Sequence, residues 1–154
     1  MGAVYFYHLT ESPLEDTLPM LVGKAQGAGW RVAVRGRDQD MIARLDARLW
    51  QGPATAFMPH AVAGGSHDAD QPVLLGVDIT ADGFDCIMSV GGADVSAAEV
   101  SAAQRTCVLF DGHDQDALAL ARTQWKTLTH AGCAAQYWAQ DMGSWTKKAQ
   151  SGAA

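Results

Sequence analysis

Short apolar runs alternate along this chain with amphipathic stretches, a pattern typical of strands that alternate with helices. The first run, Val4 to Leu9, is rich in β-branched and aromatic residues and predicts a buried strand. The spacing of hydrophobic residues between the runs predicts helices. The expected later strands are 30–35, 72–77, 84–90, 107–110 and 135–140, with a final segment at 143–147, and the expected helices are 17–26, 38–50, 96–105 and 114–130.

Residues that favour helix ends support these helices. Thr17 is the expected N-cap of the first helix, with Pro19 in the first turn, where a missing N–H costs little. Asp114 and Asp116 put negative charge at the start of the last helix, and Gly132 is expected to end it. Strands joined by helices of this length run parallel with right-handed crossovers. The chain therefore predicts a three-layer α/β fold, with a mostly parallel sheet between helices on both faces.

Composition places the chain among folded, globular proteins. A chain of 154 residues with 48% hydrophobic and 18% charged residues has the size of one domain and is too apolar to be disordered. We expect a single domain at 1–148 and a flexible tail at 149–154. No apolar run has the length of a membrane span, and the N-terminus lacks a secretory-signal pattern. Three cysteines fit neither a disulfide framework nor a zinc site, so we expect reduced thiols in a cytoplasmic protein.

The motifs of nucleotide binding are missing from the sequence. The turn after the first strand reads HLTESPLED, without GxGxxG, and no GxxxxGK[ST] occurs in the chain. We therefore expect no phosphate-binding loop, no cofactor and no catalytic constellation. His60 and the GGSHD loop at 64–68 leave one alternative, a small α/β enzyme or nucleotide-binding protein. Neither His60 nor His67 has a metal-ligand partner at the usual spacing, so no metal site is expected.

Cations and indoles gather near the end of a chain whose net charge is −6. On the last predicted helix, a turn of about 100° per residue puts Trp125 on the apolar arc and Arg122 and Lys126 at its border. This arrangement suits an acidic, apolar peptide, because the cations can hold carboxylates beside an apolar pocket. Alternatively, Trp125 belongs to the core and the cations lie at its edge. Direct DNA contact is not expected, since an acidic chain repels phosphates unless its cations are strongly segregated.

Trp50 and Phe57 form a second candidate surface. Trp50 ends a predicted helix, and Phe57 lies in a proline-bounded segment, where large aromatic side chains have fewer core neighbours than on strands. An exposed aromatic pair marks a protein interface. The alternative is that both side chains are buried under the neighbouring loop.

Several short motifs follow one another along nearly the whole chain. They are YFYHL (5–9), LDARLW (45–50), FMPH (57–60), VLFDG (108–112), AR..WK (121–126), Gly132, YWAQ (137–140) and W..K (145–148). In this order and spacing the chain resembles the chi subunits of bacterial DNA polymerase III, accessory proteins of the clamp loader. The resemblance implies a non-enzymatic adaptor with a Rossmann-like fold that lacks a phosphate-binding loop.

The resemblance also implies two partners. One is the psi subunit, which connects chi to the clamp loader and would contact Trp50 and Phe57; some members offer this surface to a helicase-like protein as well. The other is the acidic, phenylalanine-ended C-terminal tail of single-stranded DNA-binding protein, which would bind Arg122, Trp125 and Lys126. No membrane partner is implied.

The helix departs from the family pattern at Leu118, where some members carry a lysine one turn before the arginine. Lys147 or Lys148 would compensate if the C-terminal segment folds back near the helix. Trp138 and Trp145 are expected to be either core residues or walls of the peptide pocket.

Overall fold

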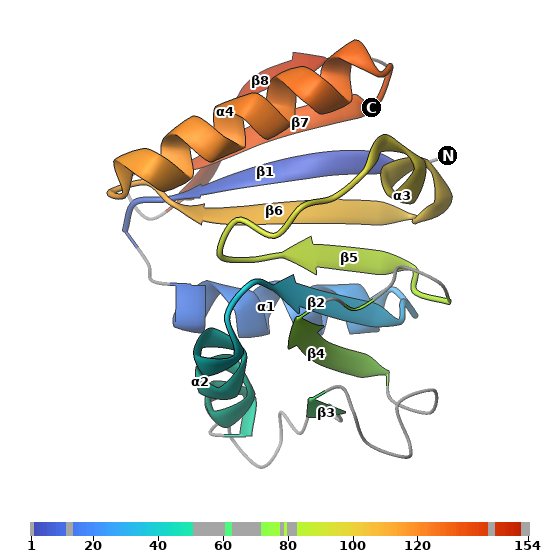
Figure 1. The fold of residues 1–154 in the computed structure, drawn as a ribbon, viewed down its shortest axis with the longest axis vertical. Coiled ribbons are helices and arrows are strands. Elements are labelled where there is room, and N and C mark those ends of the chain that lie inside the picture. Colours follow the sequence, from blue (N-terminus) through green and yellow to red (C-terminus); the bar gives the residue numbers. More distant parts are fainter. Residues whose placement is uncertain are drawn as a thin grey trace.

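One eight-stranded sheet runs through the described part of this computed structural model, which comprises residues 2–11, 14–50, 61–62, 72–77, 79, 83–141 and 144–151. The strand order is β3-β4-β2-β5-β6-β1-β7-β8 (Figure 1). Neighbouring strands are parallel except for β7 and β8, which are antiparallel. The elements are β1 (Ala3–Leu9), α1 (Leu14–Gly27), β2 (Val32–Gly36), α2 (Gln39–Trp50), β3 (Ala61–Val62), β4 (Val73–Val77), β5 (Cys86–Ser89), α3 (Ala97–Ala102), β6 (Arg105–Asp111), α4 (Gln115–His130), β7 (Ala134–Asp141) and β8 (Ser144–Ser151).

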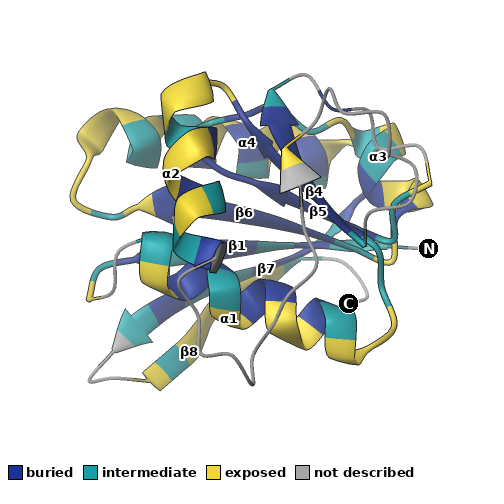
Figure 2. Ribbon diagram, turned by 90° about the horizontal axis from the view of Figure 1, so that it is seen from below, coloured by how far each residue is buried: buried dark blue, intermediate teal, exposed yellow. Residues whose placement is uncertain are grey.

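Helices cover both faces of the sheet, so the three-layer, mostly parallel α/β prediction is confirmed. On one face, α1 and α2 bury Leu18 and Ile42 against the strands. On the other face, α3 and α4 bury Val100 and Leu128 against β1 and β6. Figure 2 shows the buried strands between the helices. Because both faces are covered, the central strands are apolar runs rather than alternating sequences.

β1 lies between β6 and β7, and β2 lies between β4 and β5. The first two strands of the chain are therefore parallel, as expected, but β5 and β6 separate them. The helix after β1 and the helix after β6 pack on opposite faces of the sheet. This reversal creates a topological switch point at the carboxyl ends of β1 and β6.

The start of α1 differs from the prediction. The helix begins at Leu14, so the assignment of Thr17 as N-cap is wrong, and Thr17 is buried inside the helix. Pro19 also lies inside the helix rather than in its first turn. Leu14 packs against the core on the α1 face, and this apolar contact favours an earlier start.

The other helix ends follow local chemistry. Ser96 and Glu99 form a capping box at the start of α3, which ends earlier than expected, at Ala102. The side chain of Asp114 accepts hydrogen bonds from backbone N–H groups in the first turn of α4. Gly132 follows this helix with a φ of 91°, a conformation that glycine adopts without strain.

The C-terminal segment belongs to the sheet for longer than expected. Residues 149–151, expected in a flexible tail, continue β8, and Ala149 is paired with Tyr137. A short strand, β3, occupies Ala61–Val62, outside the ranges expected for strands. Among the described helices, none is long and apolar enough to cross a membrane. The cysteines are buried, free thiols.

Candidate functional site

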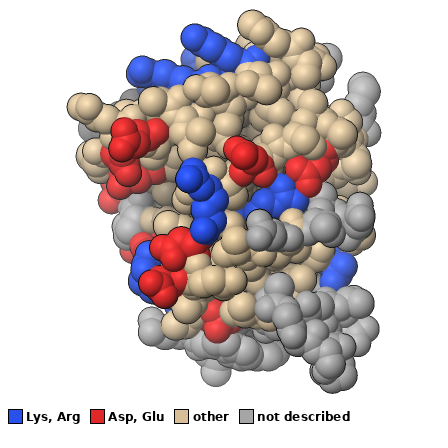
Figure 3. Space-filling view, in the orientation of Figure 1, with Lys and Arg blue, Asp and Glu red and all other residues tan. Residues whose placement is uncertain are grey.

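Helix α4 brings the predicted cations and indole together on one surface. Its inner side buries Ala121, Gln124 and Leu128, while Arg122 and Lys126 are exposed one turn apart. Within the described part of the chain, neither cation forms an ion pair. Lys and Arg side chains gather along the upper edge of the molecule, over α4 and β8 (Figure 3). These two cations are therefore available to a negatively charged partner.

Trp125 is half-buried and belongs both to the core and to the surface. Its ring packs edge-on against Phe6 at a centroid distance of 5.4 Å and against Tyr137 at 6.2 Å. Trp125 thus belongs partly to the core, and its role in a peptide pocket stays a prediction. The contacts with β1 and β7 fix the orientation of the indole, and its remaining exposed part can contact a partner.

Beside Trp125 lies a polar aromatic pair, Tyr137 and His8. The Tyr137 hydroxyl is 2.8 Å from Nδ1 of His8, and the His8 ring stacks on Phe110 at 5.2 Å. Burial lowers the pKa of His8, and the positive charge of Arg122 contributes in the same direction. Burial raises the pKa of Tyr137, while Arg122 acts against this shift. At neutral pH the pair is therefore uncharged, and Arg122 supplies the positive charge beside it.

We call this set of side chains the α4 surface: Arg122, Trp125 and Lys126 with His8 and Tyr137. The sequence did not identify the last two, because both read as members of buried strands. A histidine within the otherwise apolar run VYFYHL was the one available signal. Their position depends on the pairing of β1 with β7, which brings His8 near Tyr137.

The position of Leu118 agrees with its apolar character. Its side chain is half-buried and packs against the core beneath α4, so the turn before Arg122 carries no cation. Lys147 is the cross-strand partner of Trp138, whose side chain points to the α1 face with Lys24. Cross-strand partners share a face. The expected compensation by Lys147 is therefore not supported, and compensation by Lys148 stays a prediction.

Trp138 and Trp145 do not form a wall of the α4 surface. Both are half-buried and both lie on the α1 face, where Trp145 packs edge-on against Tyr7 at 5.3 Å. Trp145 also contacts the core cluster on that face. The indoles of the C-terminal stretch thus divide between the two faces of the sheet.

The second candidate surface falls mostly outside the described residues. Trp50 is the last residue of α2, but its side chain is not described, and Phe57 lies outside the described ranges. His60 and the GGSHD loop at 64–68 lie outside them as well. The aromatic surface and the enzymatic alternative consequently stay predictions.

The switch point of the sheet carries a cavity of about 380 Å³. Open α/β sheets usually bind ligands at this place. Three carboxylates, from Asp111, Asp114 and Asp116, line it together with Arg37, which makes it a poor site for phosphate groups. Among the described residues, no cluster of three side chains has the arrangement of a metal site.

Comparison with known proteins gave one family. The family model described as "DNA polymerase III chi subunit, HolC" matches residues 1–136 of the 154. The matched segment runs from β1 into β7 and includes all of α4. No curated protein matches the chain.

Proposed function

Because this chain belongs to the family of DNA polymerase III chi subunits, we propose that it is a non-catalytic replication adaptor whose α4 surface binds the C-terminal tail of single-stranded DNA-binding protein. The observation that carries the proposal is the pair of exposed cations, Arg122 and Lys126, beside the half-buried Trp125. A tail that is acidic and ends in phenylalanine needs both a positive charge and an apolar contact.

Each side chain of the α4 surface has a distinct role in this proposal. The guanidinium of Arg122 holds the terminal carboxylate, because its planar donors match a carboxylate in two parallel hydrogen bonds. Lys126 attracts the preceding acidic side chains as a point charge. The terminal phenylalanine packs against Trp125 and Tyr137, whose rings already lie edge-on at 6.2 Å.

The psi subunit is the second proposed partner, through Trp50 and Phe57. Trp50 ends α2, which packs on the face of the sheet opposite α4. A partner that binds at the end of α2 would therefore leave the α4 surface accessible. This separation suits an adaptor that holds psi, or a helicase-like protein, and the tail at the same time, in the cytoplasm where replication takes place.

Calorimetric titration with a synthetic acidic peptide that ends in phenylalanine tests the tail site. We expect Arg122→Ala to weaken binding by about 2 kcal/mol, or roughly thirtyfold, because it removes a charge-assisted contact with the terminal carboxylate. Arg44→Ala is the matched control, since Arg44 is also exposed but lies on α2. If the Arg122→Ala variant and the parent bind the peptide with equal affinity, the proposal is wrong.

A further inference from the structure

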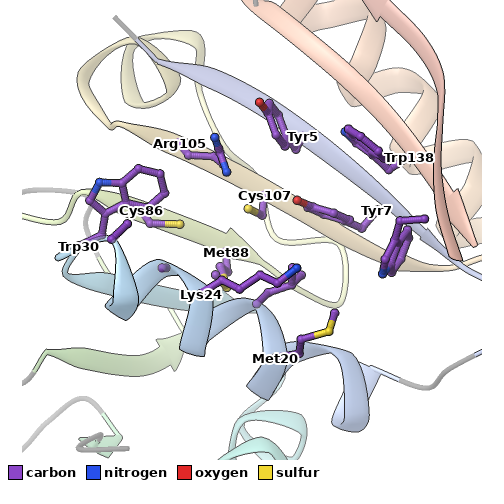
Figure 4. A pocket seen from close by; sticks show the side chains of 14 residues that line it. Tyr5, Tyr7, Met20, Lys24, Trp30, Cys86, Met88, Arg105, Cys107 and Trp138 are labelled. Carbon is purple, nitrogen blue, oxygen red and sulfur yellow. The ribbon is translucent and has the colours of Figure 1, made fainter.

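A second surface with unassigned chemistry lies on the α1 face of the sheet. Side chains of α1, β1, β5, β6, β7 and β8 enclose a cleft of about 280 Å³, shown in Figure 4. Five aromatic rings line it, from Tyr5, Tyr7, Trp30, Trp138 and Trp145. We call this the aromatic cleft. All five side chains are half-buried, so their rings are only partly covered by the protein.

The aromatic cleft and the α4 surface share two strands. Successive residues of a strand point to opposite faces. On β1, Phe6 packs under α4, whereas Tyr5 and Tyr7 face the cleft. On β7, Tyr137 contacts Trp125 and the next residue, Trp138, lines the cleft. The two surfaces are therefore back to back, and a ligand of the cleft would not compete with a ligand of α4.

The cleft is positively charged. Lys24 and Arg105 line it, and among its lining residues there is no Asp or Glu. The guanidinium of Arg105 lies 4.3 Å from the ring centroid of Tyr5 and 5.2 Å from that of Trp30, so the rings hold it in place at one end of the cleft. Exposed Lys147 is the cross-strand partner of Trp138, so it lies on the face of the cleft, where its ammonium donates to Gln150 at 2.7 Å. The cations of this acidic chain are thus segregated locally.

We propose that the aromatic cleft binds single-stranded nucleic acid. One base stacks among the rings, while the flanking phosphates contact Lys24, Arg105 and Lys147. Stacking platforms beside cations are the usual means of binding single strands without sequence preference. The small volume suits one unpaired base, and the absence of lining carboxylates favours a phosphate backbone.

The expected net-charge barrier to DNA contact does not apply to this surface. Within a Debye length of about 8 Å at physiological salt, the nearest charges dominate the potential. Among the residues that line the cleft, the charged ones are the cations Lys24 and Arg105. The inference does not depend on tail binding, because it rests on the opposite face of the sheet.

Fluorescence anisotropy with a labelled oligothymidylate of 12 nucleotides tests the proposal. The double variant Lys24→Gln/Lys147→Gln should bind about tenfold more weakly than the parent, and the slope of log affinity against log salt should fall by about 1.4, or about 0.7 per lost phosphate contact. Arg44→Gln, which removes an exposed cation from α2, should match the parent. Absence of binding by the parent, or an equal loss with Arg44→Gln, would overturn the proposal.

Two further measurements locate the ligand. Photocrosslinking with a bromodeoxyuridine-substituted strand should modify peptides that contain Tyr5, Tyr7 or Trp138; modification confined to Trp125 on α4 would contradict the assignment. Thymidine monophosphate should compete poorly, because it carries a single phosphate group. If it binds as tightly as the 12-nucleotide strand, the cleft is a mononucleotide site and the proposal of a strand is wrong.

Discussion

The ion pair between Arg35 and Glu99 ties α3 to the sheet, and removing its negative charge should destabilise the fold. Both nitrogen–oxygen contacts are short, at 2.6 and 2.9 Å, and Arg35 is buried on β2. Its guanidinium also donates to the carbonyl oxygens of Ile79 and Asp94, each at 2.9 Å. Replacing Glu99 would leave a buried cation with carbonyl partners but no counter-charge.

Glu99→Gln is the appropriate substitution because it changes charge and keeps length. Glutamine can still accept the hydrogen bond from the backbone N–H of Ser96, now 3.0 Å, so the capping box of α3 persists. Breaking a fully buried ion pair costs about 3 to 5 kcal/mol. The Glu99 side chain is 25% exposed, so water partly replaces the lost contact. We expect a loss of about 2 kcal/mol in the free energy of unfolding at pH 7.

The same substitution should show a defined pH dependence. Hydrogen bonds from Arg35 lower the pKa of Glu99 below its ordinary value of 4.5. The folded state therefore binds the proton less well than the unfolded state, and the pair stabilises the protein fully above about pH 4.5. Its contribution is lost as the pH falls through the lowered pKa. The stability gap between parent and Glu99→Gln should consequently narrow below pH 4.5.

Urea unfolding followed by circular dichroism measures this difference in the free energy of unfolding. The two proteins are compared at pH 7 and at several lower values. Ser96→Ala provides the control, because it removes the hydroxyl of the capping box and keeps the ion pair. It should cost about 1 kcal/mol at pH 7. This cost should depend on pH much less than that of Glu99→Gln, since the Ser96 hydroxyl lowers the pKa of Glu99 less than Arg35 does. The reasoning would be refuted if the free energies of unfolding of the parent and Glu99→Gln differed by less than 0.5 kcal/mol at pH 7. It would also be refuted if this difference stayed constant as the pH is lowered.

Two other substitutions test the α4 surface and the core. Leu118→Lys should strengthen tail binding two- to fivefold in calorimetry, because a lysine at this half-buried position can extend its ammonium to the surface one turn before Arg122; weaker binding by a folded variant would argue against this surface. Thr106→Val should leave the urea-unfolding free energy unchanged or raise it by up to about 1 kcal/mol, since the Thr106 hydroxyl is fully buried and has no hydrogen-bond partner among the described residues. A loss above 1 kcal/mol would show that the hydroxyl forms a stabilising contact.

Local sequence patterns predicted the central strands and helices. They did not predict the bounds of elements that depend on contacts between distant parts of the chain. β4 and β5 are buried, mostly apolar runs, so their sequences carry the signal themselves. β8 is an edge strand with mostly exposed, polar residues, and its pairing with β7 extends it through Ser151. The early start of α1 likewise depends on the contact of Leu14 with the core. No periodicity within these segments could reveal either partner.

The order of the strands in the sheet could not be predicted from the sequence, because it also depends on contacts between distant segments. The sequence indicated which strands are parallel, because crossover helices require it. It could not indicate that β6 and β7 flank β1, since that depends on how distant strands pack. The switch point of the sheet, with its acid-lined cavity, follows from this order alone.

In the candidate site, too, the residues close together in the sequence could be predicted as a group, whereas those joined by strand pairing could not. Arg122, Trp125 and Lys126 were predictable together because residues three and four apart share a helix face. His8 and Tyr137 join them only through the register of β1 with β7. Sequence proximity was also misleading for the indoles, since Trp125 on α4 packs against Phe6 on one face of the sheet, whereas Trp138 lines the aromatic cleft on the other.

Both surfaces therefore depend on one register. A slip of a single residue in β1 or β7 would turn every side chain of that strand to the opposite face. Tyr7 would then point toward α4 and His8 toward the aromatic cleft, which would place an imidazole among the rings and remove the partner of Tyr137. The register is held by burial of Val4 and Phe6 against α4 and of Leu9 on the α1 face. The apolar residues of β1 thus determine where both sets of functional side chains lie.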